Sequence, residues 1–397
     1  MKKVRKIALM AVGDSAWQGG IQYVTNILHA INTISDQNEF EIHLFKRQHQ
    51  HFQNLENFTK ISLTIHSLEK VLPAFTLPNR IYWFLQRKLF GRINPQSENY
   101  FLSQGFDFIY PATLSSCGKQ LNSGSWIADF QYYNYPEGHN RETTIAAERV
   151  IGLIAKETDK VILSSKYCEK QGFELFPVIK GKSHVMPFTV YINRAHLNDE
   201  NLQEVRDTYG LGGQYIMVSN LFGATKNHKT LFEALGILRK KGIVIICVCT
   251  GNLVNHTQME FTNEILQIIT RTGIRSQLFL LGLIPREHQV ALYRMAMLLV
   301  QPSMHEGWST CVEEAKALGK ALVLSDIDVH KEQDPNNPYF FQTMNAEDLA
   351  VVLQRAYEKN VDRQFPELEI EQNALRQYES NVRAFGENFM SIANYSA

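Results

Sequence analysis

Three carboxylates in one short stretch, SMHEGWSTCVEEA at residues 303–315, are the groups whose spacing best suits chemistry. Glu306 stands in a loop of small and polar residues, whereas Glu313 and Glu314 open a predicted helix. Thr310, three residues before Glu313, fits a capping box in which that carboxylate reaches back to the helix start. Glu314 points about 100° further round the helix and has no such duty. Carboxylates are strong acceptors for sugar and ribose hydroxyls, which makes Glu306 and Glu314 the candidates for ligand binding.

Two loops between predicted strands and helices are candidates for binding an anion. In WQGGIQYVTN, Gly19 and Gly20 stand at a helix N-terminus, where main-chain N–H groups and the helix dipole can receive a phosphate. A tight turn is the other interpretation. In SNLFGATKNHKTL, Lys226 precedes a helix and could neutralise a diphosphate, or it could be a solvated side chain beside Asn227 acting as a cap. Each loop alone leaves both interpretations open.

Composition and missing motifs exclude several classes of function. The chain has 397 residues with 40 Lys and Arg against 40 Asp and Glu, so no basic field indicates a nucleic-acid partner. It has no Walker A loop, nucleophile elbow, H-E-x-x-H motif or zinc spacing, and His228, His305 and His330 are isolated in sequence. Among five scattered cysteines, Cys247 and Cys249 alternate within an apolar run that is typical of a strand. A reduced, cytosolic protein is expected.

The N-terminus, MKKVRKIALMAVGDSA, imitates a secretory signal. Its apolar run at 7–12 is shorter than the roughly 7–15 residues that such a signal needs, so a first buried strand explains it better. No run reaches the ~18 apolar residues of a spanning helix. Any contact with a membrane would therefore be peripheral, for example at the cytoplasmic face of the inner membrane.

One segment, LPAFTLPNRIYWFLQRKLFGRI, interleaves aromatic side chains with basic ones, Arg80, Arg87, Lys88 and Arg92. It is either a membrane-surface or lipid-acceptor patch, or an ordinary amphipathic helix that packs Trp83, Phe84 and Leu85 inward. Between the two, we favour the packed helix.

Short apolar strands alternate with amphipathic helices, which predicts parallel sheets of the α/β class. Strands are expected at KIALMAV, FEIHLF, FDFIYPA, SWIADF and KVILSS in the first half and at YIMVSNL, IVIICVCTG, QLFLLGLI, LLVQPS and ALVLSDI in the second. Residues 187–213 suit a linker. We expect domains at 1–190 and 191–374, with a helix at about 375–397 packing back on the first. Two doubly wound sheets in tandem would bind ligands in a cleft at the carboxyl ends of their strands.

These motifs, in this order, resemble retaining family 4 glycosyltransferases of the GT-B fold. PSMHEGWSTCVEEAKALGKALVLSDI is similar to that family's E-x7-E element, with Glu306 and Glu314 as its two glutamates. SNLFGATKNH resembles the family's nucleotide-diphosphate loop and WQGGIQYVTN its N-terminal glycine loop. WIADFQYYNYPE, followed by KVILSSKYC, resembles bacterial members that build surface polysaccharides. The resemblance runs over nearly the whole chain.

The resemblance implies two Rossmann-like domains facing each other across a cleft, and transfer of a sugar from a nucleotide-diphospho-sugar to a hydroxyl of a glycan or lipid-linked acceptor. Glu306 would face the donor sugar, Lys226 would hold the diphosphate, and Glu314 would bind the ribose. Asp129 would face the acceptor. The implied donor-binding set is Gly19, Gly20, Asn220, Lys226, Thr250, Gly251, Gly307, Trp308, Ser309, Thr310 and Glu314. No metal and no cofactor are implied, and the loop with Asp326 and Asp328 would line the donor site.

The chain departs from the family pattern at two positions. Asn220 stands where family members commonly have an Arg, so one fixed positive charge is missing or is supplied by another residue. Tyr132 stands where related sequences often carry His after DFQ, and His139 is nearby. The alternatives to an active transferase are a catalytically silent GT-B partner subunit and another GT-B enzyme, such as a nucleotide-sugar epimerase or a phosphorylase.

Overall fold

A computed structural model describes most of the chain in two compact units. The described residues are 4–14, 18–36, 39–71, 76–90, 94–113, 116, 118, 120–135, 141–253 and 259–394. The N-terminal unit comprises Met1–Tyr191 and Ser380–Ala397, and the C-terminal unit comprises Ile192–Glu379. Arg92, Cys117 and His139 lie outside the described residues.

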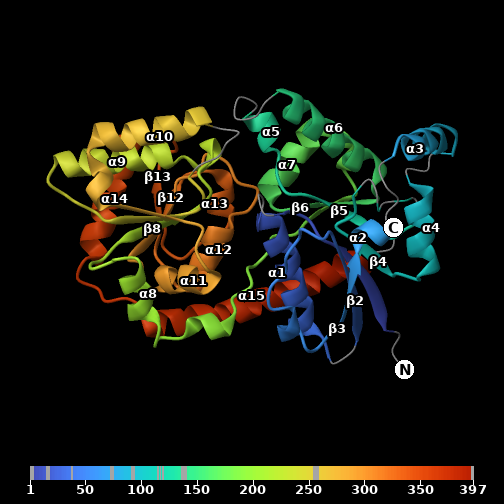
Figure 1. Cartoon of the computed structure of the whole chain (residues 1–397), viewed down its shortest axis with the longest axis horizontal. Coiled ribbons are helices and arrows are strands. Elements are labelled where there is room, and N and C mark those ends of the chain that lie inside the picture. Colours follow the sequence, from blue (N-terminus) through green and yellow to red (C-terminus); the bar gives the residue numbers. More distant parts are fainter. Residues whose placement is uncertain are drawn as a thin grey trace. The chain divides into compact units, whose positions relative to one another are not determined.

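The N-terminal unit is built on parallel strands (Figure 1). They are β1 (Arg5–Met10), β2 (Phe40–Lys46), β3 (Ser62–Ser67), β4 (Phe108–Tyr110), β5 (Gly124–Ile127), β6 (Lys160–Leu163) and β7 (Ser183–Val185). One sheet has the order β3-β2-β1-β4 and another the order β5-β6-β7. A parallel bridge between Ile109 and Ser123 joins β4 to the start of β5. The resulting order, 3-2-1-4-5-6-7, reverses direction between β1 and β4, as in doubly wound folds.

Helices connect these strands. They are α1 (Gln18–Ile34), α2 (Leu68–Val71), α3 (Leu77–Phe90), α4 (Pro95–Ser103), α5 (Gln131–Asn134), α6 (Arg141–Glu157) and α7 (Lys166–Leu175). One face of α1 is buried: Val24, Ile27, Leu28 and Ile31 are all inaccessible to solvent. Parallel pairing requires such crossovers, because each strand must return to the same edge of the sheet before the next begins.

The C-terminal unit carries a six-stranded parallel sheet in the order β10-β9-β8-β11-β12-β13. Its strands are β8 (Ile216–Ser219), β9 (Cys247–Thr250), β10 (Leu278–Gly282), β11 (Leu298–Gln301), β12 (Leu322–Ser325) and β13 (Tyr339–Phe341). Its helices are α8 (Leu202–Thr208), α9 (His228–Lys240), α10 (Met259–Thr272), α11 (Arg286–Met295), α12 (Thr310–Ala317), α13 (Asp328–Glu332) and α14 (Ala346–Asn360). Counted within the unit, the order is again 3-2-1-4-5-6, with the reversal between β8 and β11.

Both faces of the C-terminal sheet are covered (Figure 1). Val218 and Cys249 face a core formed with α9, α10 and α14, whereas Met217 and Val248 face a second core formed with α8, α11 and α12. The alternation follows from the period of two along a strand. It explains why these strands read as continuous apolar runs, since a parallel sheet buries both of its faces. Cys247 and Cys249 are buried on one face of β9, as predicted.

A long last helix, α15 (Leu368–Asn394), belongs to both units. Its C-terminal part packs on the N-terminal sheet, where the ring of Phe389 contacts Phe108 and Tyr110. The Asn122 side chain of the same unit donates a hydrogen bond of 2.9 Å to the carbonyl oxygen of Ala393. The sequence predicted this helix from its periodicity, and the structure confirms the helix over nearly the same residues.

All ten predicted strands are present, and three others, β3, β7 and β13, were not predicted. Helix α8 also lies inside the segment predicted as a linker. The prediction for α3 was wrong: Trp83 is half-buried, but Phe84 and Leu85 point to solvent, and none of the residues of the helix is buried. Among the described residues, no helix is long and apolar enough to cross a membrane.

Candidate functional site

A polar cluster occupies the point where the strand order of the C-terminal sheet reverses. Strands β8 and β11 lie side by side there, and each ends in a polar residue, Ser219 and Gln301. Because the chain leaves β8 toward α9 and leaves β11 toward α12 on the opposite face, the two loops diverge at the carboxyl edge of the sheet. Open α/β sheets bind their ligands at this place.

Asn220 and Gln301 form the floor of the cluster. The Asn220 amide donates to Gln301 Oε1 at 2.7 Å, and the Gln301 amide donates to Asn220 Oδ1 at 3.2 Å. Gln301 also donates to Ser303 Oγ at 3.1 Å and to Glu306 Oε1 at 2.9 Å. Both amides are buried. The Glu306 carboxylate can only accept, so the Gln301 atom that meets it is the amide nitrogen, and the reciprocal pair then fixes the orientation of Asn220.

Glu306 is a buried carboxylate held by a cation. Its Oε1 atom accepts from Lys226 Nζ at 2.6 Å as well as from Gln301, and only 7% of the residue is exposed. Burial alone would raise the pKa of this carboxyl, but the Lys226 ammonium outweighs it and holds the pKa below the usual value. Glu306 is therefore ionised at neutral pH, as an acceptor for ligand hydroxyls must be.

Asn227 fastens the Lys226 loop to the loop that carries Glu306. The residue adopts a left-handed conformation, with φ of 54°, immediately before α9. Its amide donates to the carbonyl oxygen of Pro302 at 3.0 Å, and its oxygen accepts from the Thr230 hydroxyl at 2.8 Å. Asn227 stands at the N-cap position of α9, but its side chain makes no capping hydrogen bond. It therefore positions Lys226 by tying two loops together.

The predicted capping box at Thr310 and Glu313 is absent. Ser309 is the N-cap of α12, without a capping hydrogen bond from its side chain. Glu313 Oε1 instead accepts from Gln333 Nε2 at 2.9 Å and Lys316 Nζ at 3.1 Å. Gln333 reaches in from the end of α13, which no local pattern could predict. Glu313 still has a structural duty, as predicted, but the partner is distant in sequence.

Gln333 also engages both main-chain groups of Ser309. Its Oε1 accepts from the Ser309 N–H at 3.2 Å, and its Nε2 donates to the Ser309 carbonyl at 3.0 Å. The N–H of Ser309 is therefore not open to a phosphate, although the sequence suggested such a donor. Gly307 is buried and Trp308 and Thr310 are half-buried in the same loop and first helical turn.

Glu314 has no capping contact, but it pairs with a cation that the sequence analysis did not name. Its Oε1 atom lies 2.6 Å from a guanidinium nitrogen of Arg286, at the start of α11. Burial opposes the charged guanidinium, but Glu314 more than compensates and raises the pKa of Arg286. Arg286 donates to Gln289 Oε1 at 2.6 Å, and Gln289 donates to Ser219 Oγ at 2.5 Å. Arg286 thus places a cation at the same edge of the sheet as Asn220.

His330 of α13, the helix that follows β12, is a further polar side chain near Glu306. Ser325 Oγ donates to the Ser303 carbonyl at 2.5 Å, which leaves both Ser325 oxygens as acceptors for His330 Nδ1, at 3.1 and 3.0 Å. Nδ1 must therefore carry the proton when the ring is neutral. Burial lowers the pKa of His330, although Glu306 opposes that shift. Its buried Nε2 is then a lone-pair acceptor with no hydrogen-bond partner among the described residues.

Thr250 and Gly251, at the end of β9, support the floor of the cluster. The Thr250 hydroxyl donates to Ser219 Oγ at 2.7 Å. Gly251 has a φ of 111°, and a Cβ atom added there would lie 2.1 Å from the Asn220 carbonyl oxygen. Only glycine permits this approach. The requirement for glycine at 251 follows from packing against Asn220.

Three of the predicted site residues belong to the N-terminal unit. Gly19 and Gly20 lie in the first turn of α1. Gly20 is buried, and a Cβ atom there would lie 2.7 Å from the main-chain nitrogen of Gly13, so close packing explains this glycine. Asp129 follows β5 and accepts a hydrogen bond from the Gln131 N–H at 3.0 Å, at the start of α5. Tyr132 lies in α5, and burial raises the pKa of its hydroxyl.

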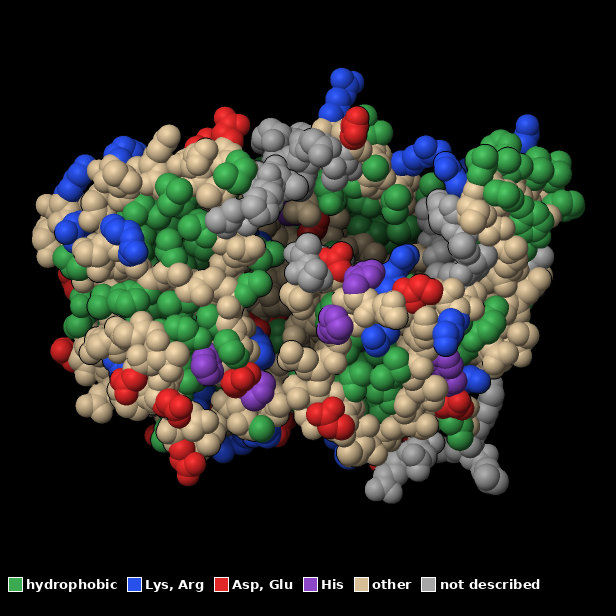
Figure 2. All heavy atoms as spheres, viewed as in Figure 1, with side chains coloured by type: hydrophobic (Ala, Val, Ile, Leu, Met, Phe, Trp, Pro, Cys, Tyr) green, Lys and Arg blue, Asp and Glu red, His purple; other side chains and the backbone are tan. Residues whose placement is uncertain are grey.

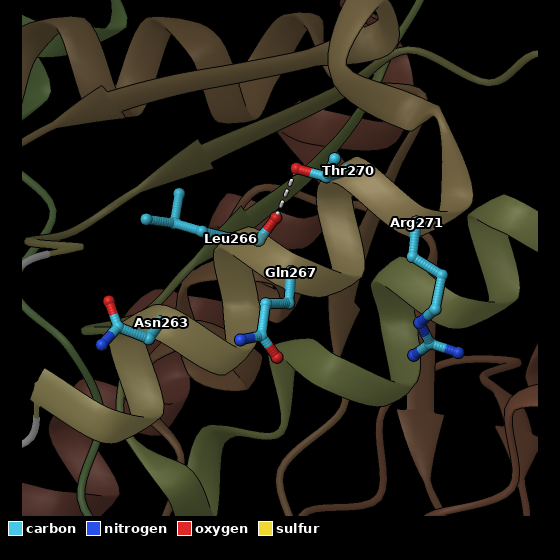
Figure 3. Close-up of a pocket in the computed structure, with 5 residues that line it drawn as sticks. All are labelled: Asn263, Leu266, Gln267, Thr270 and Arg271. Atoms are coloured by element: carbon cyan, nitrogen blue, oxygen red, sulfur yellow. Dashed lines mark hydrogen bonds between the residues drawn. The ribbon is translucent and has the colours of Figure 1, made fainter.

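A separate hollow lies on α10 (Figure 3). It is lined by five residues of that helix, Asn263, Leu266, Gln267, Thr270 and Arg271. Thr270 donates to the Leu266 carbonyl at 2.9 Å and Arg271 pairs with Glu233, so these groups are used within the helical layer. Polar groups from different elements do not converge there, in contrast to the cluster around Glu306.

Sequence reasoning missed Gln301, Arg286, His330 and Gln333. A signal existed for Gln301, because a polar residue that ends an apolar strand faces the edge where ligands bind. Arg286 follows the turn after β10 and has no motif around it. His330 was set aside as an isolated histidine. Only the meeting of the loops that follow β8, β10, β11 and β12 at one edge of the sheet brings these residues together.

Comparisons with known proteins agree with this location. Residues 203–375 match the family described as Glycosyl transferases group 1. That segment contains every member of the polar cluster. The sequence is also 27% identical over 158 residues to the serotype-specific mannosyltransferase WbdA of Escherichia coli. This alignment covers 40% of the chain and 19% of WbdA, so the chain spans about a fifth of the length of the curated relatives it matches.

Solved structures resemble the whole chain. A glycosyltransferase from Rickettsia africae superposes with a TM-score of 0.67 at 15% identity, covering 99% of both chains. Anabaena Alr3699/HepE, crystallised with UDP and glucose, superposes with a TM-score of 0.66 at 16% identity, covering 98% of both chains. These similarities confirm the fold class predicted from the sequence, α/β with two Rossmann-like units of the GT-B type. Within that fold, residues 203–375 are similar to the group 1 glycosyltransferases.

Proposed function

We propose that this protein is a retaining, metal-independent family 4 glycosyltransferase that transfers a sugar from a nucleotide-diphospho-sugar to a hydroxyl of a glycan or lipid-linked acceptor in bacterial surface polysaccharide synthesis. The observation that carries the proposal is the buried Glu306–Lys226 pair at the reversal point of the sheet. The group 1 match and the similarity to a mannosyltransferase support the same reaction class. HepE binds UDP-glucose, which supports a nucleotide-sugar donor.

Glu306 and Lys226 are best explained as two ligand-binding side chains that neutralise each other's charge until the donor binds. Glu306 is too buried to lose its counter-charge without replacement. A diphosphate would attract the half-exposed Lys226 ammonium, and hydroxyls of the donor sugar would then take its place on the carboxylate. His330 Nε2, a neutral acceptor near Glu306, would receive a further hydroxyl. The cluster therefore suits a ligand with both negative charge and hydroxyl groups.

Glu314 and Arg286 supply the nucleoside end of the donor site. Glu314 would accept from the ribose hydroxyls, and Arg286 would hold that carboxylate in place and add a positive charge close to the diphosphate. Arg286 thereby takes over the role of the cation that Asn220 lacks. The contact through Gln289 to Ser219 connects it to the end of β8.

The transfer breaks the bond between the anomeric carbon and the diphosphate oxygen and forms a bond to the acceptor oxygen on the same face. The acceptor proton passes to the leaving phosphate oxygen, so the products are a glycoside and a nucleoside diphosphate. Lys226 stabilises the charge that develops on the leaving phosphate. Asp129 of the N-terminal unit, together with Gly19 and Gly20, is assigned to the acceptor and donor sides as the family resemblance implies.

The decisive experiment measures thermal stabilisation of the full chain by UDP-, GDP-, dTDP- and ADP-sugars, followed by turnover with the sugar that binds. A ligand at 100 times its Kd adds about 2.7 kcal/mol to the unfolding free energy, which is a readily measured shift. Product anomers read by NMR distinguish retention from inversion. Absence of a shift with every donor would overturn the proposal. Binding without transfer to any acceptor would instead indicate a silent partner subunit.

Two variants separate the roles within the pair. Lys226→Met should abolish stabilisation by the free nucleoside diphosphate, because the charge that meets the phosphates is gone. Glu306→Gln should keep that stabilisation but lose the extra stabilisation that the sugar provides. Lys229→Met, which removes an ammonium of α9 that is paired with Glu264 of α10, is the matched control. If Glu306→Gln and Lys226→Met respond identically to diphosphate and sugar donor, this division of roles is wrong.

A further inference from the structure

Helix α3 of the N-terminal unit turns its polar face toward the protein and its apolar face toward solvent. Its half-buried residues, Asn79, Trp83, Gln86 and Arg87, recur at helical spacing and form the face turned toward the unit. Trp83 donates from its indole to Gln96 of α4 at 3.2 Å, and Arg87 pairs with Glu157 of α6 at 2.8 Å. Polar contacts thus hold this helix to the protein.

The opposite face of α3 is apolar and exposed. At 100° per residue, Ile81 and Lys88 lie almost directly opposite the inward face, with Leu77, Phe84 and Leu85 on either side. Leu77 is 67% exposed, Phe84 64% and Leu85 46%. Figure 2 shows hydrophobic side chains gathered over α3 at the upper right of the view. Contiguous exposed apolar surface on a folded chain marks an interaction site, since single exposed residues would need no explanation.

The charged residues of α3 itself have one sign. Residues 77–90 contain Arg80, Arg87 and Lys88 and no Asp or Glu, in a chain whose total charge is zero. Arg80 and Lys88 of α3 are exposed beside the apolar residues. Basic residues flanking exposed Phe and Leu on one helix are the pattern of a helix that lies in the interface of an anionic bilayer.

We infer that α3 docks the protein onto an anionic lipid bilayer, with Leu77, Ile81, Phe84 and Leu85 entering the interface and Arg80 and Lys88 facing the headgroups. The commitment to a lipid surface rests on this charge complementarity, because a second copy would bring the same positive charge against itself. The inference does not depend on the reaction proposed above. It gives the chain a location at a membrane surface.

Co-sedimentation of the full chain with vesicles tests the inference. Vesicles of phosphatidylglycerol and phosphatidylethanolamine should bind the protein, with binding that weakens as salt rises, and vesicles of phosphatidylcholine should bind it far less. Equal binding to both compositions, or none to the anionic vesicles, would overturn the inference. Nucleotide-sugar binding is measured on the same preparation, so failure of one idea is distinguishable from failure of the other.

Surface variants make the test specific. The double variant Phe84→Ser, Leu85→Ser should weaken binding to anionic vesicles at least roughly tenfold, and Lys88→Glu should weaken it while reducing the salt dependence. Leu283→Ser is the matched control, because Leu283 of the C-terminal unit is 72% exposed. An unchanged thermal midpoint checks folding. If Leu283→Ser weakens binding as much, or if the double variant only dissolves a dimer seen by light scattering, the surface is not a lipid-docking site.

Discussion

The two units have the same strand order up to the sixth strand, but the points at which that order reverses have opposite chemistry. In the C-terminal unit, Gln301, Glu306 and Lys226 gather between β8 and β11. In the N-terminal unit, the ring of Tyr23 in α1 packs against Tyr110, the last residue of β4, and Trp126 of β5. Topology creates a place where side chains converge, and the residues there decide whether polar groups or aromatic rings meet.

The aromatic region is held together by ring contacts and by a hydrogen bond between two tyrosine hydroxyls. Tyr23 of α1 stacks on Trp126 with 3.7 Å between ring centroids, and its hydroxyl shares a short hydrogen bond with that of Tyr110. Burial raises the pKa of both hydroxyls, so neither ionises at neutral pH. Phe188 packs edge-on against both Tyr23 and Trp126. These contacts hold α1 against β4 and β5 and stabilise the unit.

The largest expected effect is on catalysis at the C-terminal cluster. Lys226→Met should lower kcat/KM for sugar transfer at least about 100-fold, because the charge that stabilises the leaving phosphate is removed. Tyr23→Phe in the aromatic region should change kcat/KM by less than about twofold. Steady-state kinetics on both variants measures the contrast. A comparable loss in Tyr23→Phe would show that the two regions do not differ in function.

The next effect separates the adjacent glutamates. Glu314→Gln should weaken nucleotide binding about tenfold, because a ribose acceptor and the partner of Arg286 are lost together. Arg286→Gln should act through the same contact, so the double variant should be little worse than either single one. Glu313→Gln should lower stability with a smaller effect on binding, since its carboxylate meets Gln333 and Lys316. Titration calorimetry decides, and equal weakening by Glu313→Gln and Glu314→Gln would contradict the assignment.

A third effect concerns the pH dependence of stability, to which His228 of the C-terminal unit contributes. His228, at the start of α9, is fully buried and stacked on Phe222, and burial lowers its pKa to about 3. A lowered folded pKa means that stability is present above the unfolded value of about 6.5 and is lost as pH falls toward 3, by up to about 1.4 kcal/mol per pH unit. His228→Phe should remove this component, so its thermal midpoint should fall less between pH 7 and 5 than that of the wild type. Parallel pH curves would refute this.

The smallest effect is on stability in the aromatic region. Tyr23→Phe should cost about 1 kcal/mol, since one buried hydroxyl bond is lost while the ring stacking on Trp126 remains. Adding Tyr110→Phe should cost little more, because the orphaned hydroxyl is removed as well. Urea unfolding measures both. A cost for the double variant that equals the sum of the two single costs would show that the hydroxyls have separate partners.

Much of the fold could be predicted from the sequence, because the strands of a parallel sheet that is buried on both faces are apolar runs. β8 and β11 were predicted for that reason, and β3, β7 and β13 were missed because they are short or partly exposed. Helix α3 misled the prediction, since its periodicity shows that one face is apolar but not whether that face meets protein or solvent. The direction of an amphipathic face depends on what packs beside it.

By itself, the sequence determined which segments form strands and helices, and it singled out Glu306, Glu314 and Lys226 by local spacing and family resemblance. Tertiary structure alone decided their partners. Glu306 lies 80 positions from Lys226 along the chain, and Arg286, 28 positions before Glu314, has no motif to announce it. Spacing along one helix predicts which neighbours share a face, but partners from different loops meet only when strand order brings their ends to one edge.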